Sequence, residues 1–342
     1  MNPIRDWNTF WFKPVSARPL GAIRILYGLI ALANLGLISV DFDYWYTGIG
    51  LQQGPDAREV AGPLRYSLLQ YHQDPATGHA VLAATAVVAA LFTLGWHTRV
   101  MSVLLYLGTL TLYHRNIVTN CGPDSLMTIM SFYLMLAPCG AAYSLDALRA
   151  KKRRGGTLAE PLITPWAQRL IQCQLCLIYF NTAVWKCTGV TWPNGTALHY
   201  VLHNPEVGRL SLDPLSEYPL AISLLTHGAL LTEFLLAFFL WFRATRPWVI
   251  FLGVVLHGGI EFIVNAPLFS PLMITCYIAF LHVEEWDGLL RRVNPFRWFA
   301  RSEPPQVPGR VDGPSPLRGP HARLRTPAGE AVVDEEAELV AS

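Results

Sequence analysis

Residues 166–186 read WAQRLIQCQLCLIYFNTAVWK. This apolar run is long enough to cross a bilayer, because a spanning helix needs about 20 predominantly apolar residues. It ends in Lys186, and an ammonium group at that depth is costly unless it faces a cavity or the membrane interface. Lys186 is therefore the strongest candidate for a functional residue in the chain.

The composition of the whole chain also indicates a membrane protein. Hydrophobic residues make up 52% of the 342 residues and charged residues only 15%, and the charges are bunched between long apolar runs. The formal net charge of +2 is too small to argue for nucleic acid, and the basic residues cluster where membrane topology explains them. We therefore exclude nucleic acid as a partner and expect the lipid bilayer instead.

Apolar windows along the chain predict an all-α, polytopic integral membrane bundle of about eight transmembrane helices. The expected spans are residues 19–40, 79–96, 99–114, 125–144, 166–186, 219–241, 247–264 and 268–283. The second and third are short and meet at His97, Thr98 and Arg99, so one broken hairpin is an alternative for that pair. An even number of crossings returns both termini to one side.

Lys and Arg test this topology independently, because they concentrate in alternate loops on the cytoplasmic side. Basic residues precede the first span, join the second to the third, follow the fourth, join the sixth to the seventh and follow the eighth. The other loops are mixed or acidic, or carry no charge. Both termini are therefore predicted to be cytoplasmic.

Two flanking regions lie outside the predicted transmembrane domain of residues 19–285. Residues 1–18 carry aromatic side chains among Arg and Lys, and form either an interfacial helix or an aromatic belt before the first span. Residues 286–342 are predicted to be a polar cytoplasmic tail, with disorder expected from the Pro- and Gly-rich composition beyond residue 303. The first span lacks a small-residue cleavage site and is expected to be an uncleaved anchor.

The predicted chain direction brings polar groups into the outer half of the bundle. Lys186 ends its span there, and His227 lies in the outer part of the sixth span. His257 and Glu261 share one face of the seventh, since they are four residues apart. That spacing lets the carboxylate orient the imidazole as an acid–base pair requires. The outer loop after the third span adds His114, Arg115, Asn116, Asn120 and Asp124.

Each of these residues also has a purely structural interpretation. A membrane histidine such as His227 can hydrogen-bond a neighbouring helix, and Lys186 can extend to the headgroups as an anchor. Glu233 and Arg24 can form a structural ion pair, or each can pair elsewhere. These alternatives stay open at the level of the sequence.

The cysteines give weaker signals. Cys173 and Cys176 have CxxC spacing inside an apolar helix without a second pair, which favours small core residues over a metal site. Cys121 and Cys187 both fall at the outer face, where an oxidising compartment permits a disulfide.

Five segments, taken in order and spacing, resemble one known family. They are residues 18–28 (RPLGAIRILYG), 114–124 (HRNIVTNCGPD), 138–146 (PCGAAYSLD), 179–195 (YFNTAVWKCTGVTWPNG) and 257–269 (HGGIEFIVNAPLF). Together they look like the HTTM domain, the membrane part of vitamin K-dependent γ-glutamyl carboxylase and its bacterial relatives. The similarity covers about residues 17–285. It implies a multi-pass protein of a bacterial inner membrane.

The resemblance implies a chemistry for Lys186. In the carboxylase, a lysine at the matching position is the base that deprotonates vitamin K hydroquinone. Oxygen then converts the hydroquinone into a strong base that removes a γ-proton from a protein glutamate, and carbon dioxide adds to the carbanion. The expected cofactor is therefore reduced vitamin K, or a menaquinol-like quinol, with O2 and CO2, and the expected substrate is a secreted peptide or a small molecule.

Lys186, His257 and Glu261 are the expected catalytic residues, and no metal is expected. The expected binding residues are His114, Arg115, Asn116, Asn120, Asp124, Trp192, His227 and Asn265.

Two departures from the carboxylase keep a second function open. The carboxylase continues into a large lumenal domain, whereas a short polar segment follows the last span here. The carboxylase also has a chemically important histidine near the position where this chain has Asp124. Bacterial relatives include proteins needed to mature a secreted toxin peptide. The chain is therefore expected to be a carboxylase-like enzyme or a non-enzymatic maturation or export factor that binds a peptide, lipid or quinone.

Overall fold

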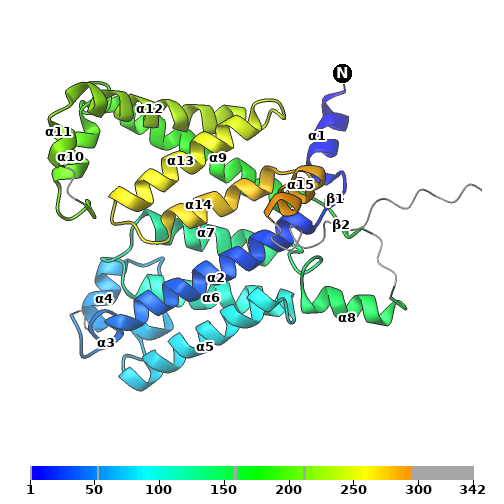
Figure 1. Cartoon of the computed structure of the whole chain (residues 1–342). Helices are drawn as coiled ribbons and strands as arrows, with labels where there is room; N and C mark the ends of the chain where they lie inside the picture. Colours follow the sequence, from blue (N-terminus) through cyan, green and yellow to red (C-terminus); the bar gives the residue numbers. More distant parts are fainter. Residues whose placement is uncertain (1, 52–53, 157–159, 211–212, 294–342) are drawn as a thin grey trace, which may run out of the picture. The chain divides into compact units, whose positions relative to one another are not determined.

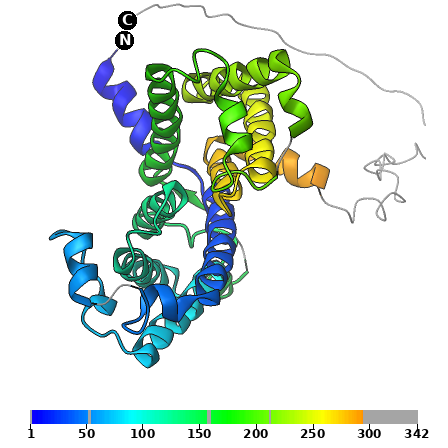
Figure 2. The same ribbon diagram turned by 90° about the vertical axis from the view of Figure 1, so that its left-hand side faces the viewer.

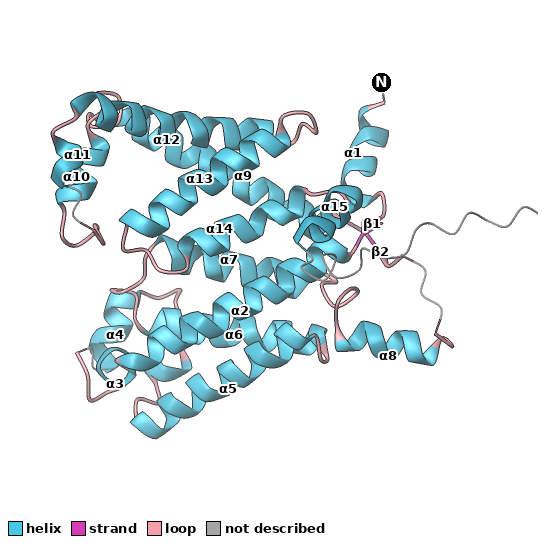
Figure 3. Cartoon of the chain, in the orientation of Figure 1, coloured by secondary structure: helices cyan, strands magenta, loops and turns pink. Residues whose placement is uncertain are grey.

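A computed structural model describes residues 2–51, 54–156, 160–210 and 213–293 of the chain. Within these ranges the fold consists of the helices α1 to α15, two short 3-10 helices and one antiparallel pair of two-residue strands. Figure 3 shows how far helices dominate. The expectation of an all-α protein is confirmed.

Eight of the helices overlap the predicted spans. They are α2 (Arg18–Val40), α5 (Pro75–Leu94), α6 (Thr98–Arg115), α7 (Gly122–Leu136), α9 (Trp166–Thr188), α12 (Pro219–Phe239), α13 (Arg246–Ile263) and α14 (Phe269–Tyr277), which continues as the 3-10 helix η2 (Ile278–Phe280). Four of the described helices, α2, α5, α12 and α13, are long and apolar enough to cross a membrane. The number of crossings beyond these four stays a prediction.

The loops gather at two ends of the bundle (Figure 1). One end, called the basic end below, holds α1 (Pro3–Phe12), β1 (Val15–Ser16), β2 (Leu162–Ile163), α8 (Leu145–Arg153) and α15 (Val283–Val293). The opposite end holds α3 (Phe42–Tyr46), α4 (Gly54–Ala61), the 3-10 helix η1 (Leu68–Gln70), α10 (Ala197–His203) and α11 (Asp213–Ser216).

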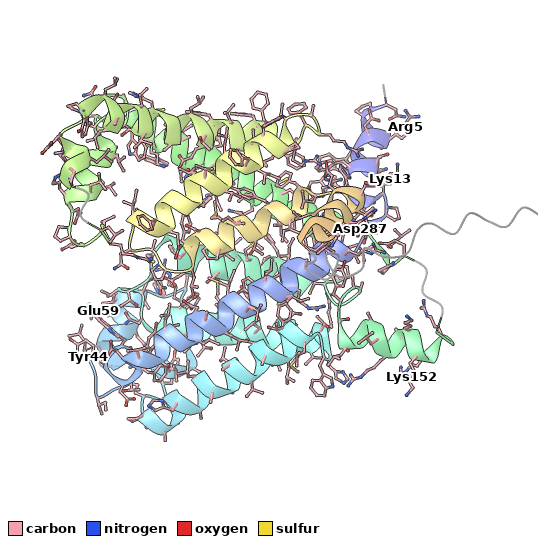
Figure 4. The ribbon with its side chains drawn as sticks, in the orientation of Figure 1. Arg5, Lys13, Tyr44, Glu59, Lys152 and Asp287 are labelled. Atoms are coloured by element: carbon pink, nitrogen blue, oxygen red, sulfur yellow. The ribbon has the colours of Figure 1, made fainter. Side chains whose placement is uncertain are left out.

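Basic residues gather at one of these two ends. Arg5, Lys13 and Lys152 lie at the basic end together with the acidic Asp287, whereas Glu59 and Tyr44 lie at the opposite one (Figure 4). The position of the three basic residues agrees with the alternation of basic loops in the sequence. Assignment of the basic end to the cytoplasm stays a prediction.

The eight helices of the bundle form two groups with α2, α7 and α14 between them (Figure 2). One group contains α5 and α6, and the other contains α9, α12 and α13. Helix α2 packs closely on α5 at Gly28, where an added Cβ would lie only 3.2 Å from the Cα of Thr93. A residue without a side chain is therefore needed at this crossing.

Helices α5 and α6 are two separate helices joined by a tight turn, in place of a single broken segment. Gly95 ends α5 in the left-handed conformation with a φ of 71°. Asp146, at the start of α8, binds the turn: it accepts from the backbone nitrogens of His97 at 3.0 Å and Thr98 at 2.7 Å, and from the Thr98 hydroxyl at 2.7 Å. Partial burial opposes ionisation, but these hydrogen bonds outweigh it and lower the pKa of Asp146.

Arg24 is completely buried in α2, and it does not pair with Glu233. Its guanidinium donates to the carbonyl oxygens of Cys139 at 2.9 Å, Ala142 at 3.1 Å and Tyr143 at 2.5 Å. These contacts serve both terminal nitrogens of the buried charge, whereas its Nε is buried without a hydrogen-bond partner among the described residues. Arg24 therefore stabilises the irregular backbone between α7 and α8, where the sequence predicted a continuous span to residue 144.

The flanking regions have partly the expected structure. Residues 3–12 form α1, which buries none of its residues, and its location at a membrane interface stays a prediction. The first part of the predicted tail is helical, as α15 extends to Val293. The disorder expected beyond residue 303 lies outside the described residues.

Candidate functional site

Lys186 lies in the last turn of α9 and forms an ion pair with Glu233 of α12. The Lys186 side chain is 25% exposed and that of Glu233 only 8%. Thr182, one turn earlier on the same face of α9, lies with its hydroxyl 3.4 Å from the second carboxylate oxygen of Glu233. A carboxylate buried in an apolar bundle needs such partners, so Lys186 and Glu233 form one unit.

Trp192, in the loop after α9, completes the surroundings of Lys186. The Lys186 ammonium lies 4.3 Å from the centroid of the Trp192 ring, a cation–π distance. His227 of α12 binds this loop, with its Nε2 3.1 Å from the carbonyl of Pro193, while its Nδ1 lies 3.0 Å from the carbonyl of Ser223. The structure thus brings Trp192 to Lys186, and gives His227 contacts with backbone.

A buried chain of three aromatic side chains begins farther along the same face of α9. The Tyr179 hydroxyl lies 2.7 Å from Nε2 of His257 in α13 and 2.5 Å from the hydroxyl of Tyr277 in α14. All three residues are at most 2% exposed. The other ring nitrogen of His257, Nδ1, is buried and has no hydrogen-bond partner among the described residues.

The two clusters belong to one polar row, which we define as Tyr179, Thr182, Lys186, Glu233, His257 and Tyr277. Tyr179, Thr182 and Lys186 share one helical face, because they are spaced three and four residues apart along α9. The row therefore joins α9 to α12, α13 and α14 with groups that can exchange protons.

The predicted pair of His257 and Glu261 is not formed, which corrects the interpretation of their spacing. His257 points into the bundle and bonds Tyr179, whereas Glu261 lies 3.9 Å from Arg209. The reason is local: residues 207–209 pair with the end of α13 through hydrogen bonds such as Asn265 N to Val207 O at 2.7 Å. Glu261 therefore belongs to this junction, and Asn265 contributes its backbone to it.

The predicted binding residues at the end of α6 and in the loop that follows contact neighbouring backbone. Four side chains do so: His114 Nδ1 lies 3.1 Å from Tyr66 O, Arg115 donates to Thr47 O at 3.0 Å, Asn116 to Trp45 O at 3.2 Å and Asn120 to Tyr113 O at 2.8 Å. Asp124 accepts from the backbone nitrogen of Cys121 at 2.9 Å at the start of α7. These contacts fix the opposite end of the bundle.

Asn120 and Asp124 also line a cavity of about 270 Å³ at that end. Asn34, Asp41 and Trp45 contribute to the same wall. Lys186 is not among its lining residues. The loop after α6 and the polar row are therefore two separate places in the described structure.

The cysteines form no disulfide. Cys121 and Cys187 are each free and exposed, so the suggested pairing is not made. Cys173 is exposed and Cys176 half-buried, which places the first of them outside the core, contrary to expectation. No group of three or more His, Cys, Asp or Glu side chains in the described ranges could hold a metal ion.

Sequence reasoning singled out Lys186, Trp192 and His257 but missed the roles of Tyr179, Thr182, Glu233 and Tyr277 in one site. One signal was present: Tyr179, Thr182 and Lys186 recur at helical spacing within an apolar run. The partners on α12 and α14 had no comparable signal.

Comparison with known proteins gives the family. The HTTM domain matches residues 12–286, which include all eight helices of the predicted bundle. Sporulation-delaying protein SdpB of Bacillus subtilis (strain 168) is 23% identical over 217 residues, which are 61% of this chain and 65% of that protein. The aligned region thus spans less than two thirds of this relative. No solved structure gives a significant match. The resemblance seen in the sequence is confirmed, and the chain belongs to the HTTM domain family.

Proposed function

We propose that this protein is a quinol-dependent, carboxylase-like enzyme of a bacterial inner membrane that modifies a secreted peptide or a small molecule. The observation that carries the proposal is the polar row, in which Lys186 and Glu233 meet inside an apolar bundle. Ionisable groups at such depth mark functional sites, because their burial is costly. Membership of the HTTM family supports the same reading.

Lys186 is the proton acceptor in this proposal. An amine accepts a proton only when it is neutral, and Glu233 lies where it can receive the proton that Lys186 gives up. The transfer exchanges two buried charges for two neutral groups, which the low dielectric of the site favours more than water does. Lys186 can then deprotonate an acidic hydroxyl held against it.

Two residues of this region suit the headgroup of a reduced quinone. Trp192 offers an aromatic face beside the ammonium, and Nδ1 of His257 is a buried nitrogen without a partner among the described residues. A flat ring with hydroxyl groups meets both requirements. When bound, the quinol with O2 supplies the strong base that removes the γ-proton before CO2 adds.

Tyr179 and Tyr277 form a hydrogen-bonded chain with His257 in the same polar row. The Tyr179 hydroxyl bonds both the Tyr277 hydroxyl and His257, so a proton received at one end can be passed along this chain. The roles proposed here are therefore proton acceptance for Lys186, proton exchange for Glu233 and orientation of His257 for Tyr179.

A non-enzymatic maturation or export factor is the second candidate. The ion pair of Lys186 with Glu233 favours it, because a paired ammonium is already satisfied without any substrate. SdpB, the relative matched above, is named for an effect on sporulation and not for a reaction. In this alternative the same row positions helices around a bound peptide, lipid or quinone.

The proposed topology has eight crossings with both termini in the cytoplasm. Its support is the concentration of Arg5, Lys13 and Lys152 at the basic end. Single cysteines at Lys152 and Asn204, in a chain without its native cysteines, test it. An impermeant thiol reagent added outside intact cells should label position 204 and leave position 152 unlabelled, and the reverse pattern would contradict the topology.

Mass spectrometry separates the two candidate functions. Membranes containing the protein are incubated with reduced menaquinone, ¹³C-bicarbonate, air and candidate secreted peptides. The proposal expects a glutamate product heavier by one labelled CO2, dependent on the quinol and lost in Lys186→Met but not in the surface control Lys152→Met. A peptide that is retained unmodified by both variants would favour the maturation factor.

A further inference from the structure

A second cavity lies at the basic end and shares no residue with the polar row. Its volume is about 440 Å³, within the range of small-ligand sites. Its walls come from α1, β1, the start of α9, the turn after α12, η2 and the start of α15. The lining residues that matter here are Phe10, Gln168, Arg169, Trp241, Phe280 and Glu284.

Arg169, in the first turn of α9, brings a positive charge to this cavity. Its Nε donates to the carbonyl of Phe10 at 3.2 Å and its Nη1 to the side chain of Gln172 at 2.8 Å. No carboxylate pairs with Arg169 among the described residues. Arg246, which lines the same cavity, differs because Glu285 neutralises it at 3.0 Å. Arg169 is therefore the arginine of the lining that no described carboxylate pairs, while Glu284 is an exposed carboxylate of the same lining.

The start of α9 adds backbone donors beside this charge. Its N-cap is Pro165, which provides no side-chain hydrogen bond, so the first N–H groups of the helix are not capped from within the helix. Pro165, Gln168 and Arg169 all line the cavity. The free donors and the positive end of the helix dipole favour a phosphate at this point.

Gln168 has a hydrogen-bond acceptor that a ligand in this cavity could satisfy. It is 7% exposed, and its amide nitrogen donates to the carbonyl of Ala279 at 2.6 Å. Its Oε1 is buried and has no hydrogen-bond partner among the described residues. A buried carbonyl oxygen without a donor is destabilising, so a ligand that fills this cavity should carry a hydroxyl or an amine as well as an anion.

Aromatic rings give the cavity an amphipathic wall. The rings of Phe10 and Trp241 lie 5.7 Å apart, and those of Trp241 and Phe280 lie 5.2 Å apart. Helix α1, which contributes Phe10 to the wall, also exposes Trp7 and Phe12. Aromatic side chains of this kind are typical of the boundary between hydrocarbon and headgroups.

We propose that this cavity binds a glycerophosphate group, with the phosphate at Arg169 and the first turn of α9 and a glycerol hydroxyl donating to Gln168 Oε1. The same chemistry is present in the headgroup of an anionic phospholipid and in soluble glycerol phosphate. Basic pockets between membrane helices are known to take lipid headgroups. The site is independent of the function proposed for the polar row.

Native mass spectrometry of the delipidated full-length protein tests the site, with phosphatidylglycerol and sn-glycerol 3-phosphate titrated in separate arms. Arg169→Gln should weaken binding about tenfold, since it removes a charge-assisted contact. Glu284→Gln should tighten binding about threefold, because Glu284 is an exposed carboxylate in the lining and repels an anion. Arg243→Gln, also at the basic end but absent from the lining, is the matched control and should bind like wild type.

The two arms identify the source of the ligand. Binding of the lipid alone identifies a lipid site. Binding of glycerol phosphate, with or without binding of the lipid, supports the headgroup chemistry if Arg169→Gln weakens that binding. Equal losses in Arg169→Gln and Arg243→Gln would overturn the proposal, because the attraction would then be general. If Arg169→Gln does not fold, Glu284→Gln decides, and unchanged binding in that variant would overturn the site.

Discussion

Replacing Lys186 by Met should destabilise the protein through Glu233. The Glu233 side chain is 8% exposed, and the substitution leaves it the Thr182 hydroxyl, at 3.4 Å, as a polar partner. Removing one partner of a fully buried ion pair costs about 3–5 kcal/mol. Lys186 is 25% exposed, so water replaces part of its contact, and we expect a loss of roughly 2–3 kcal/mol.

The double variant Lys186→Met, Glu233→Gln should recover most of that stability. It removes both charges, and a buried pair replaced as a whole is close to neutral, so we expect a loss of at most about 1 kcal/mol. Glu233→Gln alone should cost about 1 kcal/mol, because the ammonium left behind can reach solvent. The three variants thus give a coupling energy of about 2 kcal/mol in a double-mutant cycle.

Thermal unfolding of the purified protein in one detergent measures this cycle. A loss of 2–3 kcal/mol corresponds to a fall in Tm of roughly 3–4 °C for a chain of this size. Turnover should be lost in Lys186→Met and should not return in the double variant, which separates stability from catalysis. Additive losses, with the double variant the least stable, would refute the idea that Lys186 and Glu233 act as one buried unit.

Three further predictions concern other parts of the structure. Tyr179→Phe removes the hydroxyl that bonds His257 and should cost about 1–2 kcal/mol in thermal unfolding and about tenfold in turnover. Asp146→Asn should cost about 1 kcal/mol near neutral pH. Burial opposes ionisation of Asp146, but hydrogen bonds from Thr98 and His97 lower its pKa. The ionised carboxylate therefore stabilises the fold at pH values above the ordinary carboxyl pKa, and this stabilisation is lost as the pH falls through the lowered pKa. Gly28→Ala should cost about 1–3 kcal/mol by forcing α2 from α5, whereas Gly36→Ala, whose Cβ meets no atom within 4 Å, should be neutral or stabilising.

Each of these has a contradicting result. Full activity in Tyr179→Phe would remove the aromatic chain from the site. A stability difference between wild type and Asp146→Asn that persists unchanged to about pH 2 would mean that the charge of Asp146 is not what matters. Equal unfolding temperatures for the two alanine variants would show that α2 and α5 do not pack as closely as described.

The helices were largely predictable because a spanning helix leaves a signal along the chain. Its length and apolar composition are local properties, and the predicted ranges for α2, α9 and α13 agree with the structure within two residues at each end. The span expected over residues 125–144 shows the limit. Helix α7 ends at Leu136, before Pro138, and Arg24 of a distant helix binds the carbonyls that follow. Such stabilisation from another part of the fold leaves no local pattern.

The same distinction applies to the site. Lys186 could be predicted because an ammonium at the end of an apolar run is unusual by itself. The sequence could not show whether Glu233 pairs with Lys186 or with Arg24. That choice depends on how far α12 is shifted along α9. The pairing of His257 with Glu261 failed for a related reason: a shared helical face permits contact, but Tyr179 and Arg209 on other segments offered better partners.

The most direct test of the account is quinol consumption by Lys186→Ala with added amines. Purified protein in lipid nanodiscs is mixed with reduced menaquinone and O2, and loss of the quinol is followed optically, so no peptide substrate has to be known. If Lys186 is the proton acceptor, Lys186→Ala should lose the activity, and small primary amines should restore part of it while leaving wild type and Lys152→Ala unchanged. Consumption at the wild-type rate in Lys186→Ala without any amine would contradict the account.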